Sequence, residues 1–182
     1  MQPCSVSVMT NLTEKKYTES LNHEIDFYKQ MLVKSDAGEH ILIKSHPRDS
    51  DQKAKVLKLS LEREGYNVTL LDDKLLYFPL ELLLPQLPQV KKVYTGLSSS
   101  VMPSILVRPD INFQIGFPAH AYNYINPKYW LPFNANLCNF LKVTKQIQHG
   151  KIEPFESWDY ENETRFVKAA ASFPIEFQIL KK

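Results

Sequence analysis

The chain has 182 residues, which is long enough for one domain with its own core. Its composition, 43% hydrophobic and 23% charged, is typical of a globular protein. A formal net charge of +2, without a long basic cluster, argues against a nucleic-acid partner. Two cysteines argue against a disulfide framework and fit a reducing compartment. No apolar run approaches the roughly 20 residues that span a bilayer and no signal peptide is evident, so we expect a cytoplasmic protein.

Strands and helices alternate along the first two thirds of the sequence. Thr13 is the expected cap of a helix that runs to about Ser35, and Gly65 is the expected end of a second helix. The predicted strands lie at residues 5–8, 40–45, 66–73, 90–96 and 110–116, with further helices at 79–84 and 98–107. This alternation predicts an α/β fold, a Rossmann-like parallel sheet with helices on both faces.

After Pro118 the sequence is rich in aromatic residues and proline, and a helix is expected from about Asn134 to Gln148. Two interpretations remain open for residues 121–182. One is an element at a lipid surface, since Tyr and Trp favour membrane interfaces. The plainer one is aromatic packing against the rest of the chain. We therefore treat residues 1–182 as a single domain in which 121–182 pack back on the sheet.

A histidine follows the second predicted strand, in the sequence ILIKSHPRDS. Ligands bind at the carboxyl ends of strands in open α/β sheets, so His46 is expected at the ligand-binding edge. Pro47 disfavours helical backbone at His46 and helps to keep the ring projecting from that edge. A histidine placed there can donate a hydrogen bond to a phosphate and, when protonated, can stabilise a departing phosphate oxygen.

Gly96 and three serines, Ser98, Ser99 and Ser100, lie between a predicted strand and the following helix. The glycine allows close approach of the backbone, and a helix start with serine hydroxyls favours phosphate. The alternative is that the serines are ordinary helix caps. Because this cluster and His46 both follow strands of a parallel sheet, we expect them to share one phosphate-containing ligand.

The segments KSHPRD and GLSSS resemble the His-Pro and Ser-Ser motifs of bacterial sialyltransferases, especially the capsule polysialyltransferases. The segment YFPLELLL, which contains Glu81, resembles the Pro-x-Glu segment of the same group. The resemblance covers roughly residues 35–120. It implies the nucleotide-sugar domain of a two-domain GT-B fold, with CMP-sialic acid as donor and a glycan or glycolipid as acceptor.

The same resemblance implies roles for individual residues. His46 would be catalytic, assisting departure of the CMP phosphate as general acid, and Glu81 would bind the ribose hydroxyls. The other substrate-binding residues that it implies are Lys44, Pro47, Arg48, Gly96, Ser98, Ser99 and Ser100. It implies no cofactor and no metal dependence, and it leaves peripheral contact with the inner membrane open.

One feature of that family is not found in this sequence. Its general base lies in an acidic-acidic-glycine motif of the N-terminal domain, whereas Asp72 and Asp73 lack the glycine and follow the histidine. We expect an acidic turn there in preference to a metal site. The chain is therefore expected to be a donor-binding half whose N-terminal acceptor domain is missing, with little activity alone. Two alternatives remain open, a CDP-glycerol glycerophosphotransferase-like domain and a non-catalytic nucleotide-binding fragment.

Overall fold

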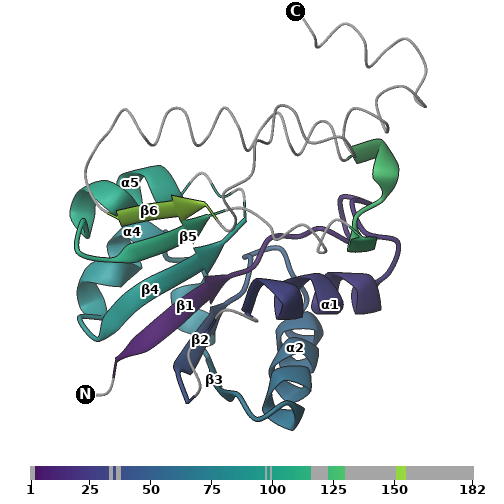
Figure 1. Cartoon of the computed structure of the whole chain (residues 1–182), viewed down its shortest axis with the longest axis horizontal. Helices are drawn as coiled ribbons and strands as arrows, with labels where there is room; N and C mark the ends of the chain where they lie inside the picture. Colours follow the sequence, from purple (N-terminus) through teal and green to yellow (C-terminus); the bar gives the residue numbers. More distant parts are fainter. Residues whose placement is uncertain are drawn as a thin grey trace, which may run out of the picture.

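The computed structural model describes residues 3–32, 35, 38–96, 98, 100–115, 123–129 and 151–154. Within these ranges an open, parallel six-stranded sheet has helices on both faces (Figure 1). The strand order is β3-β2-β1-β4-β5-β6, from β1 (Cys4–Val8), β2 (His40–Lys44), β3 (Asn67–Leu70), β4 (Val90–Thr95), β5 (Asn112–Ile115) and β6 (Lys151–Pro154). The predicted Rossmann-like fold class is confirmed.

The helices that connect these strands fall into two groups. α1 (Leu21–Leu32) and α2 (Asp51–Arg63) pack on one face, where their apolar side chains meet Ile41 and Ile43 of β2. α4 (Leu80–Leu83), the 3-10 turn η1 (Leu84–Gln86) and α5 (Val101–Val107) pack on the other face with Leu42. Neighbouring residues of a strand point to opposite faces, so one apolar run can supply both cores.

The second predicted helix is found as α2, and its end has a clear cause. Gly65 has a φ of +89°, a left-handed conformation that residues with a Cβ rarely adopt. Its N–H donates to the carbonyl of Glu62 at 3.0 Å, which satisfies one of the last helical carbonyls.

The first helix begins later than predicted, because Thr13 does not cap it. The residues before α1 form a loop in which the Glu24 carboxylate accepts from the N–H groups of Leu12 (3.2 Å) and Thr13 (2.8 Å). Ser20 takes the role of the cap, since its Oγ accepts from the His23 N–H at 3.2 Å. Tertiary hydrogen bonds to one buried carboxylate thus override the local helical pattern.

Two described segments after residue 120 lie against the earlier part of the chain. β6 pairs in parallel with β5, although no strand was predicted at residues 151–154. Ile125 forms an antiparallel bridge with Thr18, and the ring of Tyr17 packs edge-on against Tyr129 at 4.8 Å between centroids. The helix predicted at 134–148 lies outside the described residues.

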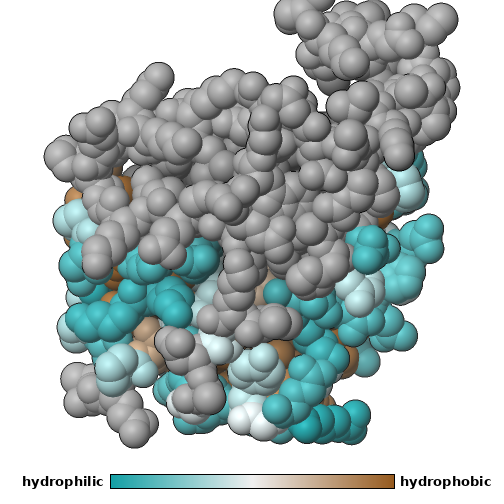
Figure 2. All heavy atoms as spheres, viewed as in Figure 1, coloured by the Kyte–Doolittle hydropathy of each residue, from teal (hydrophilic) through white to brown (hydrophobic). Residues whose placement is uncertain are grey.

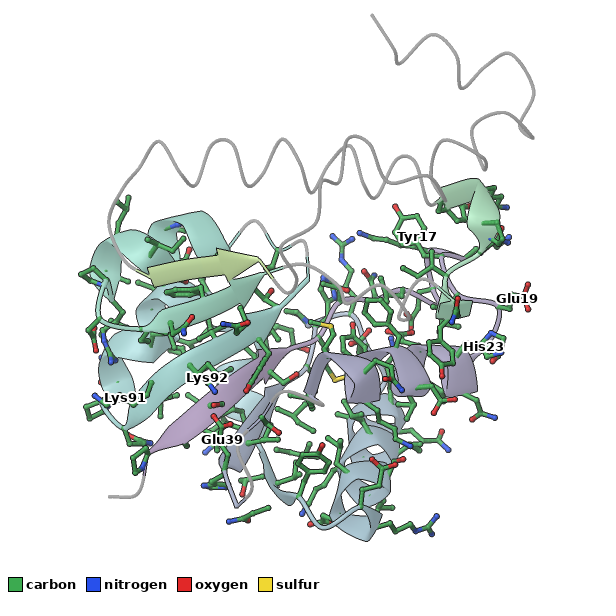
Figure 3. The ribbon with its side chains drawn as sticks, in the orientation of Figure 1. Tyr17, Glu19, His23, Glu39, Lys91 and Lys92 are labelled. Atoms are coloured by element: carbon green, nitrogen blue, oxygen red, sulfur yellow. The ribbon has the colours of Figure 1, made fainter. Side chains whose placement is uncertain are left out.

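Polar groups pair near the amino-terminal ends of the central strands. The carboxylate of Glu39, just before β2, lies 3.7 Å from the ammonium of Lys92 and accepts from the Tyr94 hydroxyl at 3.3 Å. Figure 3 shows Lys92 and Glu39 close together at this end of the sheet. The sequence motifs of interest are at the opposite, carboxyl-terminal edge.

Candidate functional site

The strand order places the two motif-bearing turns on either side of β1. The His-Pro turn follows β2 and the serine turn follows β4, and both strands are parallel neighbours of β1. Neighbouring strands lie about 4.8 Å apart, so the carboxyl ends of β2 and β4 are separated by roughly 10 Å. The helices change face between β1 and β4, and this switch point is where open α/β sheets bind ligands. Figure 1 shows α1 and α2 on one side of it and α4 and α5 on the other.

The His-Pro turn is held by its own backbone. His46 is half-buried, and its carbonyl accepts from the Asp49 N–H at 2.9 Å. The Arg48 N–H donates to Nδ1 of the His46 ring at 3.1 Å. Because Nδ1 is an acceptor, the neutral ring carries its proton on Nε2, which is then available as a donor. Pro47 and Arg48 are exposed at the tip of the turn.

The protein's own groups lower the pKa of His46 below its ordinary value. Partial burial is the largest cause, and the Asp49 carboxylate acts in the opposite direction. The remaining effect comes from three nearby cations that lower the pKa further: Lys15, Arg48 and Lys53. Any rise of this pKa would therefore have to come from a negatively charged ligand bound beside the ring.

Lys44 and Glu81, two residues singled out in the sequence, interact electrostatically on the face of the sheet that α4 covers. Lys44 ends β2 and is buried, and Glu81 is in the first turn of α4. Burial lowers the pKa of Lys44, and the negative charge of Glu81 opposes part of that effect. Oε2 of Glu81 is buried and has no hydrogen-bond partner among the described residues. The charges of these two side chains therefore attract each other near the last residue of β2.

The serine turn lies between β4 and α5. Gly96 is buried directly after β4, Ser98 and Ser100 are half-buried, and Ser99 lies outside the described residues. Ser100 is the N-cap residue of α5, but its hydroxyl makes no capping hydrogen bond. Its carbonyl accepts from the Ser104 N–H at 3.2 Å and from the Ser104 hydroxyl at 2.6 Å. The ordinary capping role therefore does not account for the Ser100 hydroxyl.

A buried lysine, Lys53, lies next to the His-Pro turn and was not predicted from the sequence. Nζ of Lys53, in the first turn of α2, donates to Asp49, Glu24 and Glu14 at 2.8–2.9 Å. Burial alone lowers the pKa of Lys53, but the three hydrogen bonds outweigh it and the net shift is upward. The sequence signal that could have identified Lys53 is its position on the apolar stripe of α2, four residues after Asp49.

The acidic pair after β3 has a structural role. The side chain of Asp72 accepts from the Lys74 N–H at 2.9 Å and so caps the short helix α3 (Asp73–Leu76). This agrees with the expected acidic turn.

A family model described as alpha-2,8-polysialyltransferase (POLYST) matches residues 2–116, from β1 to β5, including Glu81 and both motif turns. Comparisons with curated proteins and with solved structures gave no significant match. Within the described ranges no helix has the length and apolarity to cross a membrane. The described residues visible on the face in Figure 2 are largely hydrophilic. Since the match covers more than half of the sequence, the chain belongs to the alpha-2,8-polysialyltransferase family, a family of sialyltransferases.

Proposed function

We propose that this chain is the donor-binding half of a sialyltransferase that uses CMP-sialic acid and a glycan acceptor. The observation that carries the proposal is the placement of the His-Pro and serine turns on the two strands that flank β1, at one edge of the sheet. The family match supports the reaction class. The choice of donor and the assignment of a donor-binding half are our extension.

The proposed chemistry needs groups that neutralise charge developing on the CMP phosphate as it leaves. The Nε2–H of His46 would donate to a phosphate oxygen, and after protonation the ring would add a positive charge. The Ser98 and Ser100 hydroxyls would donate to the same phosphate from the other side of β1. Because these interactions strengthen as the phosphate gains charge, they stabilise the transition state more than the bound donor.

Glu81 is our candidate for the ribose hydroxyls of the donor. Its Oε2 makes no hydrogen bond among the described residues, and the nearby Lys44 ammonium offsets its charge. A carboxylate can accept from two adjacent hydroxyls, which suits a ribose. We assign no metal ion to this mechanism. The base that removes the acceptor proton would come from a separate acceptor domain.

Calorimetric titration of this chain with CMP-sialic acid, CMP and CDP-glycerol, in the presence of EDTA, tests the proposal. We expect CMP-sialic acid and CMP to bind and the chelator to have no effect. Binding of CDP-glycerol in preference to CMP-sialic acid would favour a glycerophosphotransferase-like function instead. Failure of all three ligands to bind a folded chain would refute donor binding.

Replacement of Ser98, Ser99 and Ser100 together by alanine tests the serine turn. Loss of two or three hydrogen bonds to the phosphate predicts about tenfold or more weaker CMP binding. The control is Ser60→Ala, a half-buried serine of α2 away from the carboxyl edge. Unchanged affinity in a folded triple variant would leave the serines without a part in ligand binding.

A further inference from the structure

Lys53 and its three carboxylate partners form a buried charged cluster that the proposed chemistry does not use directly. The side chains of Lys53 and Asp49 are each 1% exposed, and that of Glu24 is 0% exposed. Replacing a buried ion network by apolar side chains is often neutral or even stabilising. Stability alone therefore does not explain this network. The explanation is sought in the segments whose positions the network fixes.

The network reaches His46 through Asp49. Oδ1 of Asp49 accepts from Nζ of Lys53 at 2.8 Å, and Oδ2 accepts from the backbone N–H of His46 at 3.3 Å. The backbone N–H of Asp49 in turn donates to the His46 carbonyl at 2.9 Å. One residue, Asp49, thus links the ammonium of Lys53 to the backbone of His46, through its carboxylate on one side and its own N–H on the other.

The same ammonium is tied to the loop that follows β1. Glu24 bonds to Lys53 at 2.9 Å and accepts from the N–H of Leu12 at 3.2 Å, and from both the N–H (2.8 Å) and hydroxyl (2.5 Å) of Thr13. Glu14, from the same loop, is the third partner of Lys53, at 2.8 Å. The turn after β2 and the loop after β1 are therefore fixed to one buried point.

We propose that Lys53 and Asp49 are positioning residues for His46, holding its turn so that the Arg48 N–H occupies Nδ1 and Nε2–H is left to donate to the ligand. The identity of that ligand rests on the proposed function, whereas the orientation of the ring rests on the contacts alone. The charged groups around the ring are Asp49 and Glu14, opposed by Lys15, Arg48 and Lys53.

Asp49→Asn is the sharpest variant, because asparagine keeps the shape of aspartate. Its Oδ1 can still accept from Lys53, but an amide nitrogen in place of Oδ2 cannot accept from the His46 N–H. The matched control is Asp26→Asn, since the Asp26 carboxylate is 43% exposed and lies 3.8 Å from the Lys29 ammonium. That change removes a carboxylate of α1 without touching the network.

The readout is the ring tautomer of His46 in the full chain, measured by nitrogen NMR of labelled histidine at a pH where the ring is neutral. The His46 signals are assigned by their loss in His46→Gln. We expect the Nε2–H tautomer in wild type and in Asp26→Asn, and a mixture of both tautomers in Asp49→Asn. CMP affinity of Asp49→Asn should fall about twofold to tenfold, as for loss of one hydrogen bond.

The outcomes separate this inference from the proposed function. An unchanged His46 tautomer in folded Asp49→Asn overturns the positioning role, whatever happens to CMP binding. A changed tautomer in a chain that does not bind CMP supports positioning and refutes the donor assignment. If Asp49→Asn does not fold, Lys53→Arg keeps the positive charge but alters its geometry, and an unchanged tautomer there overturns the inference as well.

Discussion

Removal of the Lys53 ammonium should destabilise the fold far more than removal of any surface lysine. In Lys53→Met the apolar stem is kept, so the change mainly deletes three hydrogen bonds of 2.8–2.9 Å to carboxylates. The Glu14 side chain is 41% exposed and can be solvated by water, so the loss of its hydrogen bond to Lys53 should cost little stability. Glu24 and Asp49 stay buried without their cation. Breaking a buried pair in this way costs about 3–5 kcal/mol, a large fraction of the roughly 5–15 kcal/mol that stabilises a typical domain.

The assay is urea unfolding of the full chain, monitored by circular dichroism. Free energies of unfolding are compared between variants whose unfolding free energy depends equally on urea concentration. Lys58→Met is the matched control in the same helix, because Lys58 pairs with Glu62 at 3.1 Å with both side chains more than 30% exposed. We expect that control to change stability by no more than about 0.5 kcal/mol.

A second comparison separates unpaired charge from lost packing. Combining Lys53→Met with Glu24→Gln and Asp49→Asn removes the buried negative charges that the single variant leaves behind. If the reasoning is right, this triple variant is more stable than Lys53→Met alone. A free energy of unfolding of Lys53→Met within about 1 kcal/mol of the Lys58→Met control would contradict the cost of about 3–5 kcal/mol expected for breaking a buried pair.

Substitutions of His46, Glu14 and Arg108 test three other sets of contacts. His46→Ala should weaken CMP binding, whereas His40→Ala, at the amino-terminal end of the same strand, should leave the calorimetric affinity unchanged; equal effects would count against a role specific to His46. Burial raises the pKa of Glu14, but its hydrogen bonds to Lys53 and to the backbone and the electrostatic effects of Lys53 and His46 together outweigh burial, so the net shift of this pKa is downward. The stabilisation by Glu14 is therefore present above its ordinary pKa of 4.5 and is lost as pH falls through the lowered value; acid titration of Glu14→Gln should lack this part of the loss. Arg108→Lys should cost about 1–3 kcal/mol in urea unfolding, because a lysine cannot reach three backbone carbonyls and the Asp110 carboxylate together, and a cost near zero would contradict this.

The sheet was predictable because its strands are short apolar runs separated by turn residues and helices. Ile41, Leu42 and Ile43 are each buried, as a strand covered on both faces requires, and Gly65 ends α2 as expected. β6 was not predictable, because Lys151–Pro154 carries no such run and is defined by its pairing with β5. Local sequence thus determined the elements that carry their own apolar run or their own end signal, but not an element defined by its pairing with a distant strand.

The candidate site was predictable only in part, for a similar reason. His46 and the serine turn lie after strands, and the parallel topology alone brings them to one edge. The predicted start of α1 was wrong, because the hydrogen bonds that Glu24 accepts from the N–H groups of Leu12 and Thr13 depend on tertiary structure. The role of Lys53 was missed because its partners come from three separate segments. A charged residue on an apolar stripe can be seen in a sequence, but its counter-ions cannot.

Donor binding should be coupled to proton uptake by His46. Burial and three nearby cations lower the pKa of this ring, while a bound phosphate would raise it by adding negative charge. Between the lower pKa before binding and the higher pKa afterwards, the complex holds a proton that the free chain lacks. Affinity should therefore be highest at low pH and fall as pH rises through the pKa of the complex.

Calorimetry in buffers of different ionisation enthalpy measures this uptake directly. CMP-sialic acid is the suitable ligand, because its phosphodiester has no proton to lose near neutral pH, unlike the phosphate of CMP with its second pKa of about 6. We expect proton uptake by the wild-type chain and none by His46→Gln, with His40→Gln resembling wild type. Equal uptake in all three chains would mean that another group takes the proton. His46 would then remain a neutral hydrogen-bond donor, and its part as general acid would be lost.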